Sequence, residues 1–123
     1  IQLMRSIFKV MTDNGYPASF AYAKAVRSIR SIIDDIDEVG VEEYLTRRAS
    51  RTCEFAVRTS GPRVINEEAI QQIFEETEKG IFARNWLAEF NLGMPTLNRM
   101  RRTWADSDME RTGKLFRDKF GMS

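Results

Sequence analysis

Histidine is absent from the 123-residue sequence, and Cys53 is its single cysteine. Without histidine the chain lacks the usual neutral-pH general base, a Cys–His nucleophile pair and a His-containing zinc site. A single cysteine cannot form an internal disulfide, which favours a reducing compartment, so we expect a cytoplasmic protein. Long apolar runs are missing too. No stretch approaches the ~18 residues of a membrane span, and we expect no membrane association.

A strong net charge is also missing. The 19 Lys and Arg residues balance 18 Asp and Glu residues, which leaves a net charge of +1. Binding to nucleic acid needs a concentrated positive field. A local basic patch is formed by Arg99, Arg101 and Arg102 beside Trp104, but three arginines release too few counterions for useful affinity. We interpret them as the cationic side of a helix and expect no nucleic-acid partner.

The seven glycines are scattered, and none of them builds a G-x-G-x-x-G motif or a P-loop. We therefore expect no Rossmann domain in this chain. Four acids within residues 34–38 are interpreted as a solvated or salt-bridged helix end rather than a cation site. Their nearest candidate partners along the sequence are Arg47, Arg48 and Arg51. Cys53 has no histidine to activate it, so a small buried hydrophobe is favoured over a nucleophile.

Apolar residues recur at helical spacing along the chain, and no stretch alternates as a half-buried strand does. We predict one all-α domain over residues 1–123, with about six or seven helices and enough length to bury one core. The first helix covers residues 1–11 and ends at Asn14 and Gly15. The second and longest runs unbroken over residues 17–39, about 34 Å at 1.5 Å per residue.

Capping residues mark the later helices. Asn66, followed by two glutamates, starts one of them, Thr96 can cap another, and either Ser107 or Asp108 caps the last. A short helix before Gly61 has the weakest pattern. The expected ranges are residues 49–59, 66–79, 81–90, 96–104 and 107–120.

Several segments, taken in order, resemble the C-terminal helical domain of ketol-acid reductoisomerase. The resemblance covers essentially all 123 residues, and the order and spacing of the segments are more specific than any one of them. The segments are Gly15-Tyr16-Pro17, Ala21-Tyr22, Ile32-Ile33-Asp34, Ser50-x-Thr52-x-Glu54-Phe55, Ser60 to Ile65, Gly80 to Trp86 and Met94 to Leu97.

The resemblance implies a knotted, all-helical domain and an intertwined homodimer, in which we expect the first two helices to take part. The family's enzymes serve branched-chain amino-acid biosynthesis. They carry out an alkyl migration in a 2-acetohydroxy acid at two magnesium ions and then reduce the product with NADPH. A separate Rossmann domain holds the nucleotide in that family, so Mg²⁺ and NADPH would belong to a complete enzyme. We expect neither cofactor to bind this chain alone.

The sequence departs from the family where the metal chemistry lies. The long second helix of the family carries two glutamates four residues apart, and the aligned residues here are Lys24 and Ser28. An ammonium group cannot ligate magnesium, and a neutral hydroxyl is a poor replacement for a carboxylate. We predict a degenerate site that binds no metal. Lys24 either places its ammonium near the vacated metal position or reaches solvent on its flexible stem.

The substrate segment is better retained. By resemblance, Ser50, Cys53 and Glu54 are substrate-binding residues, with Cys53 in place of a smaller residue. For Ser50, a helix cap is an equally weighted alternative.

These observations predict a ketol-acid reductoisomerase-like C-terminal domain that is catalytically incompetent. Its expected partner is a second copy of the chain. A small carboxylic acid or a separate nucleotide-binding domain is a further candidate partner. One alternative is a fragment of a diverged, active reductoisomerase. Another is a helical dimerisation or interaction module. The sequence leaves open the substrate, what precedes Ile1, and whether Lys24 and Ser28 mark lost or changed activity.

Overall fold

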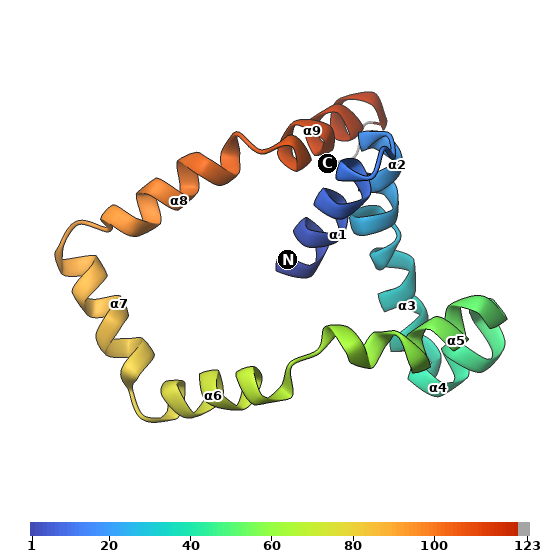
Figure 1. Cartoon of the computed structure of the whole chain (residues 1–123), viewed down its shortest axis with the longest axis horizontal. Helices are drawn as coiled ribbons and strands as arrows, with labels where there is room; N and C mark the ends of the chain where they lie inside the picture. The colour runs from blue at the N-terminus through green and yellow to red at the C-terminus, as the bar shows by residue number, and fades with distance from the viewer. Residues whose placement is uncertain (121–123) are drawn as a thin grey trace. The chain divides into compact units, whose positions relative to one another are not determined.

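The computed structural model describes residues 1–120, in which every regular element is a helix and no strand occurs (Figure 1). The all-α prediction is confirmed. The chain divides into two compact units, which are described separately. The terminal unit contains residues 1–41 and the C-terminal segment from Arg102, and the central unit contains residues 42–101. Within residues 1–120, no helix is both long and apolar enough to cross a bilayer.

The terminal unit is built on contacts of α2 (Ala18–Tyr22) with α1 (Gln2–Asp13) and α9 (Asp108–Phe120), which lie side by side in Figure 1. Its small core is formed by Phe8, Ala21 and Ala25. As predicted, α1 ends at Asn14 and Gly15. Gly15 has a φ of +92°, and the next N–H reaches back to the Met11 carbonyl, which closes the helix end.

The long second helix is present, but it is not the unbroken α-helix we expected. A π turn, η1 (Ala23–Arg27), separates α2 from α3 (Ile29–Val39). The Ser28 N–H donates to the Ala23 carbonyl at 3.0 Å, five residues back, and the Ser28 hydroxyl donates to the Lys24 carbonyl at 2.8 Å. The backbone stays in the right-handed helical region at Ser28. The hydrogen-bond register therefore shifts although the helix continues.

The short helix α4 (Val41–Glu43) begins at the last residue of the first segment of the terminal unit and leads into the central unit. The π turn η2 (Tyr44–Arg48) follows, and Leu45 on it is buried. As Figure 1 shows, the later helices follow one another along the chain, with α6 and α7 joined end to end by a short turn. After η2 come α5 (Arg51–Thr59), the 3-10 turn η3 (Gly61–Val64), α6 (Glu67–Glu78), α7 (Ile81–Asn91) and α8 (Pro95–Ala105), which crosses into the terminal unit.

The predicted caps are mostly confirmed. Asn66 caps α6 by accepting the Ala69 N–H at 3.1 Å, and Ser107, not Asp108, caps α9 by accepting the Glu110 N–H. Thr96 is not the cap of α8. Glu89 of α7 accepts the Leu97 N–H at 2.7 Å instead. A long side chain from the preceding helix supplies this cap, which local sequence does not reveal.

Burial within the chain is much smaller than expected for one domain of this length. Among the described residues, the buried apolar side chains are Phe8, Ala21, Ala25 and Leu45. Trp104 is 36% exposed and stacks under the Arg5 guanidinium, 3.7 Å from its ring centroid. The apolar stripes of the helices exist, but few of them meet a partner inside their own unit.

We predict that Gly113 is required for the contact of α9 with α2. A Cβ atom at this buried glycine would lie 2.7 Å from the Tyr22 hydroxyl and 2.9 Å from its ring. Gly113→Ala should therefore lower the free energy of unfolding by about 1–3 kcal/mol in urea titrations at fixed protein concentration, as overpacking does. Gly61→Ala is the control, because a Cβ there meets nothing within 4 Å. Equal stability of the two variants would contradict the prediction. So would a loss of stability on Gly113→Ala that is just as large in a Tyr22→Phe background, where the clashing hydroxyl is absent.

Candidate functional site

The resemblance places Lys24 and Ser28 at two metal-glutamate positions of the family, and they lie on the π turn η1 and at its end. The Lys24 side chain is exposed, and its ammonium lies 5.6 Å from the centroid of the Phe20 ring. Ser28 is half-buried and donates its hydroxyl proton to the Lys24 carbonyl. Together these two side chains offer one cation and one neutral hydroxyl whose proton is already donated to the backbone.

This donor set does not fit magnesium. Mg²⁺ is a hard cation that takes carboxylate, carbonyl or water oxygens in a strict octahedron. The Lys24 ammonium has only donors and a positive charge, which repels the ion. Within residues 1–120, no cluster of three His, Cys, Asp or Glu side chains is arranged to hold a metal.

Ser50, Cys53 and Glu54 lie together at the start of α5. Ser50 is the N-cap of this helix, and its hydroxyl oxygen accepts the Cys53 N–H at 3.0 Å. The cap interpretation is therefore confirmed. Ser50 is exposed, and accepting one bond leaves its hydroxyl able to donate a proton to another molecule. Cys53 is half-buried rather than buried.

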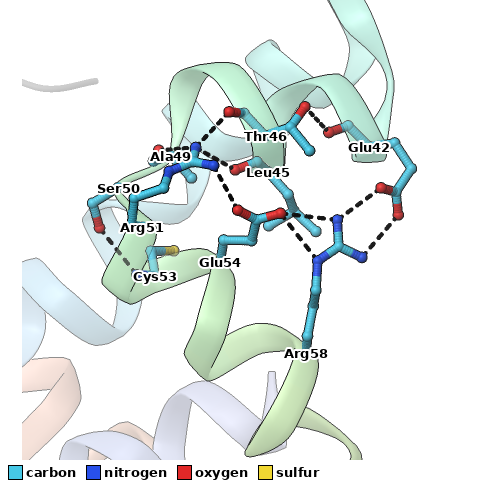
Figure 2. A network of polar contacts seen from close by, with 9 residues as sticks. All are labelled: Glu42, Leu45, Thr46, Ala49, Ser50, Arg51, Cys53, Glu54 and Arg58. Carbon is cyan, nitrogen blue, oxygen red and sulfur yellow. Dashed lines mark hydrogen bonds and ion pairs between the residues drawn. The ribbon is translucent and has the colours of Figure 1, made fainter.

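The Glu54 carboxylate lies between two arginines of the same helix (Figure 2). One oxygen accepts Arg51 Nη1 at 2.7 Å, and the other accepts Arg58 Nε at 3.1 Å. Arg51 also directs its Nη2 at the carbonyls of Leu45, Thr46 and Ala49. These carbonyls lie in and just after η2, where the helix ends and carbonyls lack onward helical partners.

A second carboxylate extends this network toward α4. Arg58 makes a bidentate pair with Glu42, with distances of 2.7 Å from Nη2 to Oε2 and 3.1 Å from Nη1 to Oε1. The hydrogen bonds and the positive charge of Arg58 lower the pKa of Glu42 below its ordinary value of 4.5. The hydrogen bonds to Glu42 and Glu54 in turn raise the pKa of Arg58.

The predicted site residues thus form two groups. Lys24 and Ser28 belong to the terminal unit, and Ser50, Cys53 and Glu54 belong to the central unit. Sequence analysis missed the roles of Arg51 and Arg58 beside Glu54. The available signal was their spacing, since residues three and four apart on a helix are neighbours.

Comparison with known proteins identifies the class to which this helical fold belongs. Residues 1–121 match the family described as "Ketol-acid reductoisomerase, C-terminal domain". The chain therefore belongs to the ketol-acid reductoisomerase C-terminal domain family, as the resemblance indicated.

Individual relatives agree with this assignment. The chain is 34% identical over 119 residues to the ketol-acid reductoisomerase (NADP(+)) of Leuconostoc mesenteroides subsp. cremoris, covering 94% of this chain and 34% of that protein. It is 32% identical over 124 residues to that of Methanocaldococcus jannaschii, covering 98% and 37%. A solved NADH-preferring ketol-acid reductoisomerase from an uncultured archean superposes with a TM-score of 0.90 at 28% identity, covering 95% and 36%. The chain spans about a third of the length of these relatives.

We predict that Arg58→Met raises the pKa of the Glu42 carboxyl toward 4.5, measured by NMR titration of its side-chain carboxyl carbon. The pKa in the folded protein is depressed, so the pair stabilises the fold above the unfolded pKa. That contribution is lost as the pH falls through the folded pKa. Arg47→Met is the matched control, because Arg47 pairs with Glu43 instead. A Glu42 pKa that stays low in Arg58→Met, or rises equally in Arg47→Met, would contradict the assignment.

Proposed function

We propose that this chain is a homodimerising reductoisomerase C-terminal domain that does not support magnesium-dependent isomerisation. The observation that carries the proposal is the pair Lys24 and Ser28 in place of two carboxylates. Where the family's reaction needs anionic oxygen ligands, this chain presents an exposed ammonium and a hydroxyl bonded to its own helix. What remains is a helical scaffold with large apolar surfaces and the Ser50 segment.

The apolar faces of α6 and α7 support dimerisation. Phe74 on α6 and Leu87 on α7 are each 58% exposed, and among the described residues neither helix buries a side chain. An amphipathic helix gains little stability in water unless its apolar face is covered. Other exposed apolar residues on these helices are Ile70, Ile73, Phe82, Trp86 and Phe90.

The first helix supports dimerisation as well. Phe8 packs into the terminal core, while Leu3 and Val10 on α1 are 55% and 60% exposed. Apolar side chains of α1 thus lie both in the terminal core and on its exposed surface.

The size of the accessible surface area also supports binding of a second copy of the chain. The chain exposes 9997 Å². A compact 14.3 kDa monomer would expose roughly 6,800 Å², and two separate compact units of half that mass roughly 8,200 Å² together. The chain therefore exposes about 1,800 Å² more than two separate compact units would, or about 3,600 Å² more per dimer. Obligate homodimers bury about 2,000–5,000 Å² in total, so this excess is of the size that a second copy buries.

We further propose that the Ser50 segment retains affinity for a small carboxylic acid. The support is the family pattern Ser50-x-Thr52-x-Glu54 together with an exposed hydroxyl that still has a proton to donate.

A second candidate function is a diverged, active reductoisomerase that uses Mg²⁺ and NADPH with a nucleotide-binding domain outside this sequence. It is favoured by the retained Ser50 and Glu54 and by relatives about three times longer than the chain.

We predict that the chain is a dimer at micromolar concentration in sedimentation velocity. Phe74→Asp combined with Leu87→Asp should shift it to monomer, because two charges then lie on faces that association would desolvate. Gln72→Asp combined with Asn85→Asp is the matched control, since it adds the same charge at exposed polar positions of the same helices. A monomeric unmodified chain, or dissociation of both variants alike, would refute dimerisation through these faces.

We predict magnesium affinity in the millimolar range or weaker for the unmodified chain in calorimetry. Lys24→Glu combined with Ser28→Glu should tighten binding, because it restores two carboxylates to positions within one helical turn. Lys24→Gln combined with Ser28→Ala removes the ammonium without adding a ligand and should leave binding weak. If the unmodified chain instead bound magnesium at micromolar concentration and lost it on Ser50→Ala, the diverged-enzyme function would replace ours.

A further inference from the structure

Glu54 is the most enclosed charged group of the network in Figure 2. Its side chain is 17% exposed, against 64% for Arg51 and 74% for Glu42. Both of its oxygens are bonded to guanidinium groups. Charge-assisted bonds of this kind are stronger than neutral ones and fix the orientation of a planar guanidinium. Glu54 therefore restricts where the Arg51 side chain can lie.

Arg51 connects the two helix ends that meet at Ser50. It is the first residue of α5, yet its Nη2 reaches back to the carbonyls of Leu45, Thr46 and Ala49. Ser50 lies between Ala49, whose carbonyl Arg51 binds, and Arg51 itself. The Ser50 hydroxyl is fixed from the other side by the Cys53 N–H. Arg51 thus holds the backbone before Ser50, and Glu54 in turn holds the Arg51 guanidinium.

We propose that Glu54 is a positioning residue that acts through Arg51 to fix the Ser50 hydroxyl, rather than a residue that contacts a ligand. A carboxylate would repel a small carboxylic acid at close range. Both Glu54 oxygens already accept bonds from arginine, so the residue is engaged with its own chain. The importance of this positioning for ligand binding rests on the proposed function of Ser50, but the positioning itself does not.

The test is amide hydrogen exchange in the full chain, read at Cys53. The Ala69 N–H is the internal reference, because Asn66 caps it in the same way at the start of α6. Glu54→Ala should speed Cys53 exchange about tenfold or more relative to Ala69, as expected for a lost charged hydrogen bond. Glu54→Gln, which keeps the shape, should have a smaller effect. Glu42→Gln is the matched control, since it unpairs Arg58 from Glu42 without touching Arg51, and it should leave the ratio unchanged.

Arg51→Met distinguishes positioning from general stabilisation. It should reproduce the Cys53 effect, and adding Glu54→Ala to it should give no further increase, because the two residues act in series. The proposal is overturned if Cys53 and Ala69 exchange accelerate equally in Glu54→Ala. It is also overturned if Glu54→Ala still accelerates Cys53 exchange in the Arg51→Met background.

A separate titration with oxalate, a small dicarboxylate probe, followed by NMR at Ser50, addresses the ligand. If oxalate binds and Ser50→Ala abolishes binding, Glu54→Ala should weaken it at least severalfold. Unchanged oxalate affinity in Glu54→Ala would overturn the positioning role in binding. If oxalate fails to bind the unmodified chain, the proposed ligand function fails while the exchange result still decides the positioning.

Discussion

The structure depends on one constraint, which is that an amphipathic helix must cover its apolar face. In the terminal unit α1, α2 and α9 meet this need around Phe8, Ala21 and Ala25. In the central unit Leu45 is the one described residue whose apolar side chain is buried, although α6 and α7 carry full apolar stripes. The polar contacts of that unit are mostly exposed, and exposed ion pairs contribute little each. Helix-end contacts can set where each helix starts, but the stability must come from covering the stripes.

Hydrogen bonds at the helix ends fix the local backbone where the small core makes no contact. At the start of α5, the Ser50 cap and the Arg51 contacts satisfy backbone groups that the break between η2 and α5 leaves without helical partners. Both candidate site segments adjoin a π turn, since η1 contains Lys24 and η2 ends just before Ser50. A π turn inserts one residue into the hydrogen-bond register and changes which side chains share a face. The local backbone at both segments is therefore set by irregular helix geometry.

Features set by neighbouring residues could be predicted from the sequence, whereas features set by more distant contacts could not. Helix type and most ends followed from residues that act locally, such as Asn66 at a start and Gly15 at an end, and the fold class followed with them. Burial could not be predicted, because whether Phe74 is covered depends on what packs against it and not on its spacing. The Glu89 cap and the π turns were missed for a related reason, since each depends on contacts outside the short window that sets helix propensity. The site residues were named from the family pattern, but the sequence did not assign Glu54 its arginine partners.

If Lys24 and Ser28 stand at the family's metal positions, as the resemblance implies, they differ from two carboxylates in charge more than in spacing. The two positions are four residues apart across the π turn, so they stay within about one helical turn of each other. By the resemblance, one positive group here corresponds to two negative groups in the family. Restoring one carboxylate at Ser28 alone would pair it with the Lys24 ammonium, a neighbour that competes directly with a divalent ion. On the proposed function, metal binding therefore needs both substitutions together, because a carboxylate at Ser28 alone would be paired with the Lys24 ammonium.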